Sequence, residues 1–248
     1  TTWDELYSIG EIIKTKTGIA GIGLAGKDND HTMHQFLNYL YSNGGQVIDF
    51  NTGKITLKSN QTVKALDFYS KLVSISQQDP LTWGRSQLTE LFNDKKIAMY
   101  INGPWGAGQH NADLNIKTVR IPAGPDGFQS TILITDSVVV FSNTGHEDIA
   151  SAAAAKLTSV DAQYSLDVGW GLTPVMKYPQ ISKEDGLYDT DYWRAFIDVI
   201  ADGKPEPLFT DYKAFQAVMN SMIQKAILKE GLSEDLVLEA SEKLKKYR

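Results

Sequence analysis

The sequence predicts an α/β protein, and two observations carry that prediction. Segments whose apolar residues recur at helical spacing alternate along the chain with short, isolated runs of β-forming residues. This alternation excludes both a helical bundle and a β-sandwich. The chain has 248 residues, of which 42% are hydrophobic and 22% charged, a composition typical of globular proteins with ample material for a core.

The first part of the chain opens on a helix. Thr2 and Glu5 have the spacing of a capping box, which predicts a helix from Thr2 to about Lys16. Helices are also expected at His31–Tyr41, Asn60–Val73 and Ser86–Asp94, strands at Ile19–Leu24 and Ile97–Ile101, and a hairpin at Asp49–Leu57. Because the chain starts so abruptly, we expect it to be the processed or truncated remainder of a longer protein.

The second part of the chain contains its most β-rich run, Thr131–Ser142, which is expected to form a strand. A loop rich in glycine and proline is expected at Gly169–Pro174. The expected helices of this part are His146–Leu157, Ser159–Val168, Thr190–Ala201, Asp211–Lys229 and Ser233–Lys246.

Charge and cysteine content exclude several classes of function. The net charge is −6, and the basic cluster at Lys243–Arg248 ends a helix, where cations offset the helix dipole, so no nucleic-acid partner is predicted. The absence of cysteine excludes a thiol nucleophile, a disulfide framework and thiolate metal sites, and is compatible with an extracytoplasmic compartment. No apolar run is as long as a membrane span.

Two short motifs suggest a cofactor or a metal but lack the context that either needs. Gly21–Gly26 matches G-x-G-x-x-G, yet its glycines lie within the expected strand and no helix follows directly to hold a pyrophosphate. In Asp28–His34, read as a calcium loop, Met33 takes the place of the turn glycine and Tyr39 that of the bidentate glutamate. His31 and His34 lack an evident third zinc ligand. We therefore predict neither cofactor nor metal.

Catalytic motifs are also missing. The sequence contains no nucleophile elbow, no P-loop and no His-Glu-x-x-His, so no catalytic residue is predicted. Carboxylates are plentiful, and a carbohydrate-active enzyme with a pair of acids therefore stays an alternative.

Tryptophans next to turn-forming residues are the strongest remaining signal. Trp105 lies among Gly103, Pro104 and Gly106, and Trp170 precedes Gly171. One interpretation is that such rings close the edge of a core. The other is that flat, partly exposed rings stack on the apolar face of a sugar or on another ring.

Taken in order, several blocks of the chain resemble the sugar-binding group of ABC-transporter solute-binding proteins, the group that includes maltose-binding protein. The resemblance covers nearly the whole chain, and the block Leu91–Trp105 (LFNDKKIAMYINGPW) is the most specific part of it. The other blocks are Thr2–Leu6, Tyr41–Gly45, Asn60–Val73, Pro122–Gly127, Asp136–Phe141 and Gly171–Val175.

The resemblance implies a bilobal α/β fold of the periplasmic-binding-protein type II, here a C-terminal lobe plus part of the N-terminal lobe. Residues 1–134 are then the main part of the C-terminal lobe, 137–185 belong to the N-terminal lobe, and 186–248 add the closing helices of the C-terminal lobe. The first part of the family's N-terminal lobe has no counterpart in this chain, and it is therefore expected as a partner.

Several ligand contacts are implied by the same resemblance. Trp105 matches the family's sugar-stacking tryptophan, and Phe215 falls where another cleft aromatic lies. Trp170 and Gly171 match a loop at the cleft edge.

The implied polar contacts lie at three places in the sequence. His34 and Gln35 occupy a helix-start position that contacts ligand in relatives. Arg85 stands where some relatives have tyrosine, and Asp136 lies on the hinge strand within reach of ligand hydroxyls.

The function implied by the resemblance is a non-enzymatic, extracytoplasmic binding protein that captures a mono- or oligosaccharide and delivers it to the transmembrane subunits of an ABC permease. Another polar solute is the first alternative, either a polyamine or a phosphorylated polyol. Arg85 would favour an anion, whereas a carboxylate-rich cleft would favour a cation.

Overall fold

The computed structural model describes residues 1–178 and 187–247, which form two compact units. Unit 1 combines Thr1–Ile101, Val119–Leu133 and Val199–Arg248. Unit 2 combines Asn102–Thr118 and Ile134–Asp198, so it contains the segment expected in the N-terminal lobe and also residues 102–118 and 187–198. The expected boundary between residues 185 and 186 lies outside the described residues.

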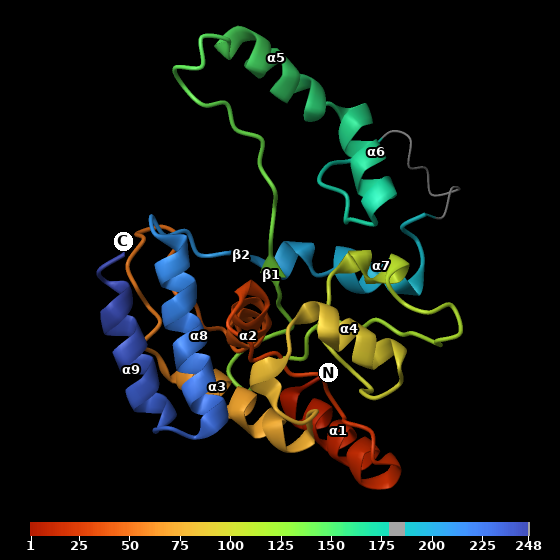
Figure 1. Ribbon diagram of the computed structural model, residues 1–248, viewed down its shortest axis with the longest axis vertical. Coiled ribbons are helices and arrows are strands. Elements are labelled where there is room, and N and C mark those ends of the chain that lie inside the picture. Colours follow the sequence, from red (N-terminus) through yellow and green to blue (C-terminus); the bar gives the residue numbers. More distant parts are fainter. Residues whose placement is uncertain (179–186, 248) are drawn as a thin grey trace. The chain divides into compact units, whose positions relative to one another are not determined.

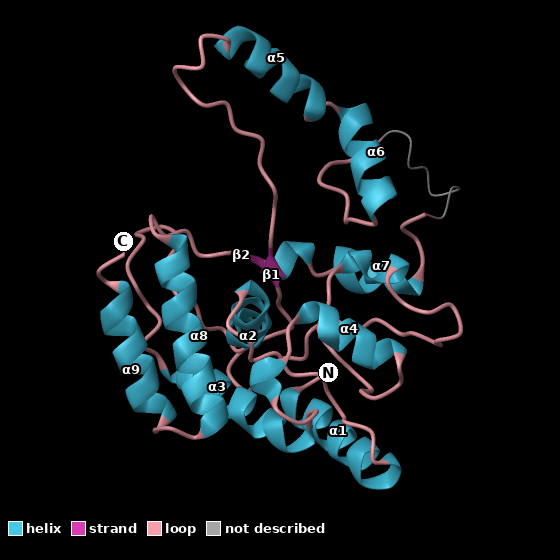
Figure 2. Ribbon diagram, in the orientation of Figure 1, coloured by secondary structure: helices cyan, strands magenta, loops and turns pink. Residues whose placement is uncertain are grey.

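Unit 1 is built mainly from helices (Figures 1 and 2). Its α-helices are α1 (Trp3–Thr17), α2 (Asp30–Ser42), α3 (Asn60–Leu72), α4 (Arg85–Asn93), α8 (Tyr212–Leu228) and α9 (Ser233–Leu244). Short 3-10 turns lie at Val73–Ile75, Pro80–Thr82 and Ile200–Asp202. Helices α8 and α9 pack against each other and against α3, and α2 packs between α3 and α8, so the two ends of the chain share one core.

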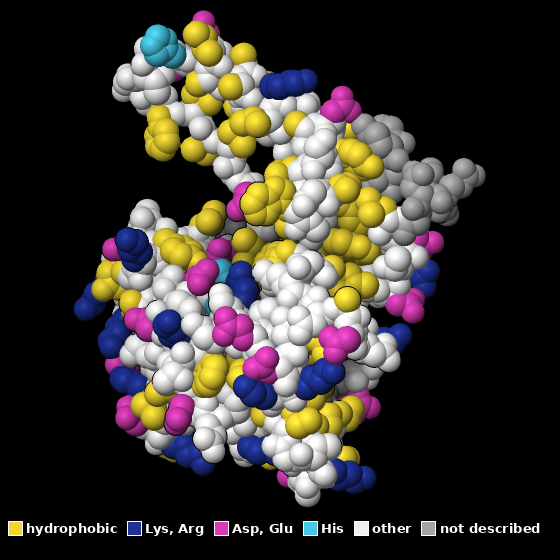
Figure 3. Space-filling view, turned by 45° about the vertical axis from the view of Figure 1, so that its right-hand side comes forward, with side chains coloured by type: hydrophobic (Ala, Val, Ile, Leu, Met, Phe, Trp, Pro, Cys, Tyr) yellow, Lys and Arg dark blue, Asp and Glu magenta, His cyan; other side chains and the backbone are white. Residues whose placement is uncertain are grey.

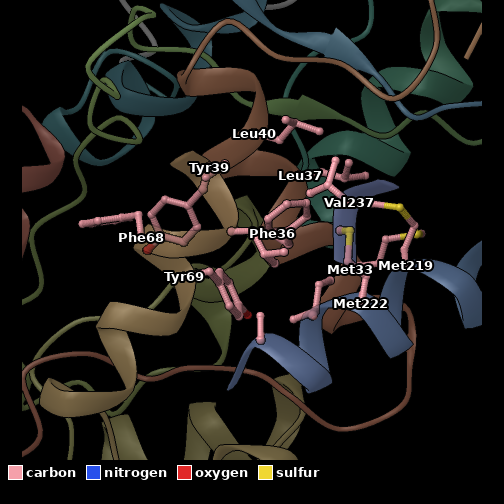
Figure 4. Packing of buried hydrophobic residues seen from close by; sticks show 14 of the residues in the cluster. Met33, Phe36, Leu37, Tyr39, Leu40, Phe68, Tyr69, Met219, Met222 and Val237 are labelled. Atoms are coloured by element: carbon pink, nitrogen blue, oxygen red, sulfur yellow. The ribbon is translucent and has the colours of Figure 1, made fainter. Parts of the chain in front are cut away.

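Helix α2 lies at the centre of that core, because every one of its residues after Asp30 is buried. Figure 4 shows Phe36 and Tyr39 of this helix facing Phe68 and Tyr69 of α3. Trp3 of α1 stacks on Phe68 with the ring centroids 4.5 Å apart. Each such side chain contributes about 1.5–3 kcal/mol through removal from water, so this aromatic group is a main source of unit 1 stability.

Local signals that start helices are confirmed. The Thr2 side chain accepts a hydrogen bond from the Glu5 amide, and the Glu5 carboxylate accepts one from the Thr2 amide, as a capping box requires. Asn29 caps α2 and Ser59 caps α3 through the side chain alone, which accepts from the amides of Thr32 and Thr62.

The expected strands at Ile19–Leu24 and Ile97–Ile101 are only partly confirmed. The two segments run parallel, and Ala98 N donates to Ala20 O at 2.9 Å. Within the described residues, however, these pairs are isolated bridges, and regular strands occur only at β1 (Ile132–Leu133) and β2 (Lys204–Pro205), which pair in parallel.

Side-chain amides take the place that a neighbouring strand would occupy. Gln77 Oε1 accepts from Leu24 N at 2.9 Å, and Gln77 Nε2 donates to Leu24 O at 2.6 Å. The Gln35 amide pairs with the residues on either side of Leu24. Its Oε1 accepts from Ala25 N at 2.6 Å, and its Nε2 donates to Gly23 O at 3.0 Å. Because side chains pair with these buried backbone groups, the pairing with residues 75–76 does not continue as a regular strand beyond the bridge between Ile22 and Ser76.

The prediction of a strand throughout Thr131–Ser142 is wrong beyond Leu133. Residues 134–142 form no regular strand, and the side chains of Val138–Phe141 are exposed. The β-propensity of such residues reflects packing on a half-buried sheet, and this segment has no sheet beside it within the described residues.

Unit 2 contains α5 (Glu147–Leu157), α6 (Val160–Trp170), α7 (Asp191–Ile197) and a 3-10 turn at Pro104–Gly108. Asp167 of α6 is buried, and its carboxylate accepts from Val175 N at 3.2 Å and from the Tyr178 hydroxyl, which fastens the loop after α6. Helix α5, in contrast, has no buried residue.

Unit 2 exposes much apolar surface. Figure 3 shows apolar side chains gathered over the upper region, where Figure 1 draws α5 and α6. The exposed residues in and before these helices include Ile134, Val138, Val139, Val140, Phe141, Ile149, Leu157, Val160, Leu166, Val168 and Trp170. Exposed apolar patches of this extent are typical of interaction surfaces. No described helix combines the length and apolarity that crossing a membrane requires.

Candidate functional site

The first turns of three helices of unit 1 meet around one group of polar side chains. His31 and His34 come from α2, Arg85 begins α4, Tyr212 begins α8, and Glu206 follows β2 directly. We call these five residues the polar cluster. Helix N-termini carry partial positive charge, so this is a favourable place for acceptor groups.

An ionised carboxylate lies within the polar cluster. Glu206 Oε1 is 2.6 Å from His34 Nε2 and 2.5 Å from the Tyr212 hydroxyl. Burial opposes ionisation of Glu206, but the hydrogen bonds from His34 and Tyr212 outweigh it and hold the pKa of Glu206 below its usual value. Burial, together with this carboxylate, raises the pKa of the Tyr212 hydroxyl, which therefore stays protonated and donates.

His31 has a different environment. Burial, followed by the positive charge of Arg85, lowers the pKa of His31 to about 3, so the ring is neutral at physiological pH. Arg85 Nε donates to His31 Nδ1 at 3.3 Å. The structure thus gives Arg85, which the resemblance implied as a ligand contact, a hydrogen bond to His31, which the sequence suggested only as a zinc ligand.

Gln35 and Phe215, also predicted as ligand contacts, are fully buried in unit 1. The Gln35 amide is engaged by the backbone at residues 23 and 25 and by the Tyr69 hydroxyl, which donates to Oε1 at 2.7 Å. Phe215 stacks on Phe209 with centroids 4.4 Å apart. Both side chains therefore have structural roles here, and their contact with a solute stays a prediction.

Trp105 of unit 2 is half-buried, and its ring folds back over its own turn. A Cβ atom added at Gly103 would lie 2.2 Å from Trp105 Cη2, so only glycine lets the ring rest on the backbone at that point. The glycine-rich frame seen in the sequence thus has a direct steric function: it provides a seat for the indole.

Helix α7 holds the Trp105 turn in place. The Tyr192 hydroxyl donates to Pro104 O at 2.8 Å, and Thr118 Oγ1 donates to Tyr192 O at 2.8 Å. Tyr192 also packs beside Trp193 and Phe196, with ring centroids 5.6 Å and 5.5 Å away. Nothing in the sequence around Tyr192 pointed to this role, because its partner Pro104 is 88 residues earlier.

The loop after α6 reaches the same turn. Gly171 ends α6 with a φ of +66°, and a Cβ atom added there would lie 3.6 Å from Trp105 Cα. Trp170, the residue before it, is 72% exposed. The structure therefore brings Trp105, Trp170 and Gly171 into one region of unit 2, whereas Asp136 lies on the exposed segment 134–142.

In the described part of the chain, no group of three or more histidine, aspartate or glutamate residues is placed to hold a metal ion.

Comparison with known proteins decides the family. A family model described as "Bacterial extracellular solute-binding protein" matches residues 1–164, about two thirds of the chain. The chain belongs to this family. Among curated members of similar sequence, binding proteins of Brucella abortus (strain 2308) and Brucella suis biovar 1 (strain 1330) are each 24% identical over 247 residues. The alignments cover 97% of this chain and 59% of those proteins, so the chain spans about three fifths of their length.

Solved structures of solute-binding proteins have the same fold. Maltose-bound MalE3 of T. maritima matches with a TM-score of 0.79 and 24% identity, over 99% of this chain and 65% of that one. An ABC-transporter solute-binding protein of Thermotoga lettingae TMO, bound to α-D-tagatose, matches at 0.77 and 23%, over 99% and 64%. One from Agrobacterium radiobacter K84, in complex with ribitol, matches at 0.73 and 20%, over 99% and 64%. These matches confirm the expected bilobal, periplasmic-binding-protein-like fold class.

Proposed function

We propose that this solute-binding protein captures a mono- or oligosaccharide outside the cytoplasm and delivers it to the transmembrane subunits of an ABC permease, without catalysing a reaction. The observation that carries the proposal is the half-buried indole of Trp105, seated on Gly103 and held by Tyr192. Membership of the extracellular solute-binding family supports it, as do similar structures bound to maltose, tagatose and ribitol.

Sugar chemistry matches the available groups. A sugar presents C–H faces, which stack on aromatic rings, and hydroxyl edges, which need donors and acceptors. Unit 2 offers the rings of Trp105 and Trp170, and unit 1 offers the polar cluster. Because that cluster combines the guanidinium of Arg85 with the carboxylate of Glu206, its charges favour a neutral polyhydroxyl solute over a polyamine or a phosphorylated polyol.

In the proposed mechanism, the solute binds the closed arrangement of the two lobes more tightly than the open one. Binding therefore shifts the protein toward the closed state, and the permease recognises that state.

Truncation of Trp105 tests the aromatic contact. Trp105→Ala is expected to weaken sugar binding by more than about 1 kcal/mol, or about fivefold, because the stacking surface is removed. The melting temperature should change little. Calorimetry with maltose, D-tagatose and ribitol as probes measures the effect.

Trp83→Ala is the matched control, because Trp83 is also half-buried but packs in the small apolar group around Leu88 and Ile97 of unit 1. It should lower the melting temperature and leave affinity nearly unchanged. An unchanged affinity in Trp105→Ala would remove this ring from the site.

A further polypeptide segment is proposed to complete the protein, namely the first part of the N-terminal lobe. The support is the exposed apolar surface of unit 2 and the length of the curated relatives. We expect the chain alone to bind sugar weakly or not at all and to increase the fluorescence of an apolar dye. The full-length protein should bind sugar and show less dye fluorescence. Full affinity in a well-folded monomer of the chain alone would contradict this proposal.

A thermal-shift screen on the full-length protein distinguishes the solute classes. Ligand at about 100 times its Kd adds about 2.7 kcal/mol to native-state stability, which raises the melting temperature. We expect shifts with sugars or polyols and none with spermidine or a sugar phosphate. Turnover of any glycoside in a hydrolysis assay would overturn the binding-only function.

A further inference from the structure

Two buried ring nitrogens in the polar cluster have no hydrogen-bond partner among the described residues. They are His31 Nε2 and His34 Nδ1. The two side chains belong to residues that are only 4% and 8% exposed. A buried polar atom without a partner costs desolvation free energy, because it has lost its hydrogen bonds to water. Two such atoms close together therefore need an explanation.

The contacts of His31 fix which of its nitrogens carries hydrogen. Arg85 Nε donates to His31 Nδ1 at 3.3 Å, and a guanidinium has no acceptor, so Nδ1 must be the accepting nitrogen. The neutral ring then carries its hydrogen on Nε2. The unpartnered atom of His31 is therefore a donor.

The contacts of His34 give the opposite result. Its Nε2 lies 2.6 Å from the carboxylate oxygen Glu206 Oε1, and an ionised carboxylate only accepts, so Nε2 carries the hydrogen. In the neutral tautomer that has its hydrogen on Nε2, the other nitrogen, Nδ1, has a free lone pair. The unpartnered atom of His34 is therefore an acceptor.

We propose that His31 Nε2 and His34 Nδ1 form a donor and acceptor pair that binds hydroxyl groups of the solute. The two residues are three positions apart on α2, a spacing that places side chains next to each other on a helix. A hydroxyl both donates and accepts, which an ammonium group or an ionised phosphate does not. The inference rests on the proposed sugar-binding function and assigns its polar contacts to individual atoms.

The pair lies beside a partly exposed member of the polar cluster. Glu206 has 20% of its side chain exposed, so the polar cluster reaches the surface of unit 1. Tyr212, whose hydroxyl lies 3.4 Å from His34 Nε2, is on the same side of the ring as Glu206 and leaves Nδ1 to other groups.

Substitution by asparagine and glutamine separates the two nitrogens of each ring. The side-chain amide of asparagine lies near the position of histidine Nδ1, and that of glutamine near Nε2. His34→Gln therefore keeps a donor for Glu206 and loses the proposed acceptor, whereas His34→Asn does the reverse. His31→Asn keeps an acceptor for Arg85 and loses the proposed donor, whereas His31→Gln keeps the donor.

The test measures sugar affinity by calorimetry on the full-length protein at pH 8. The probe is whichever of maltose, D-tagatose and ribitol binds the unsubstituted protein most tightly. His34→Gln and His31→Asn are expected to weaken binding about 3- to 10-fold, the usual effect of one neutral hydrogen bond. His34→Asn and His31→Gln, which keep the proposed solute contact, should each weaken binding less than the other substitution at the same position.

Three outcomes would overturn the inference. The first is equal affinity in all four variants. The second is a loss of affinity that follows the loss of melting temperature, which would mean that the two nitrogens serve the fold or hold an internal water. The third is a hydrogen on Nδ1 of either ring in nitrogen NMR spectra of the unliganded protein. If the unsubstituted protein binds none of the probes, the proposed function fails as well, and this result is distinct from the other three.

Discussion

Gln35→Leu is expected to lower the free energy of unfolding of unit 1 by about 2–5 kcal/mol. The substitution removes the amide that pairs with Ala25 N and Gly23 O, and each buried backbone group left without a partner costs about 1–3 kcal/mol. The Tyr69 hydroxyl adds little to the loss, because it also donates to Ala25 O at 2.6 Å. Urea unfolding followed by circular dichroism measures the change.

Two other glutamines provide the controls. Gln77→Leu should cost a similar amount, because Gln77 pairs with both backbone groups of Leu24. Gln163→Leu should change stability by less than about 0.5 kcal/mol, since this amide makes a hydrogen bond to Leu157 O in an exposed setting. A Gln35→Leu variant that unfolds at the same urea concentration as the unsubstituted protein would show that the segment finds another partner.

Gly21→Ala is expected to destabilise unit 1 by about 3 kcal/mol. A Cβ atom at this position would lie 2.4 Å from Gly10 O and 2.5 Å from Gly10 Cα, which are backbone atoms of α1. Because a backbone cannot move aside as a flexible side chain does, the helix must shift and lose packing. The expected loss of stability lies at the upper end of the range measured for overpacked cores. The midpoint of urea unfolding reports it.

Gly169→Ala in α6 is the matched control, because a Cβ atom there would meet nothing within 4 Å. This variant should gain about 0.5–1 kcal/mol in the stability of its helix, since alanine loses less backbone entropy than glycine. If Gly21→Ala proved as stable as the unsubstituted protein, the close contact between α1 and the 20–25 segment would not exist in solution.

The helices of this protein could be predicted from the sequence because their signals are local. A capping box at Thr2 and Glu5, a cap at Ser59 and apolar residues at helical spacing are all contained within a few positions of each helix. The strands could not be predicted in the same way. Whether residues 20–25 become a regular strand depends on what lies beside them. Here residues 76 and 97–100 form only isolated bridges with this segment, and the side chains of Gln35 and Gln77 pair with its residues 23–25.

In the candidate site as well, residues with nearby partners in the sequence could be predicted, and residues with distant partners could not. Trp105 could be found because the residues that seat it are its neighbours in sequence. Glu206 and Tyr212 could not, because they meet His34 across 172 and 178 residues of sequence. Resemblance to the family pointed to His34, Arg85 and Phe215, which lie near the starts of α2, α4 and α8. The burial of Phe215 depends on packing with Phe209, which no motif records.

Because unit 1 is built from separate segments of the chain, its core cannot be completed until late in synthesis. Helices α2 and α3 end by Leu72, but their partners α8 and α9 begin only at Tyr212, 140 residues later. At roughly 5–20 residues per second, the ribosome needs on the order of 10–30 s to make the intervening chain. During that interval the apolar faces of α2 and α3 stay uncovered and available to chaperones. For a protein proposed to work outside the cytoplasm, a core that cannot be completed until α8 and α9 are made suits export of the chain before it folds.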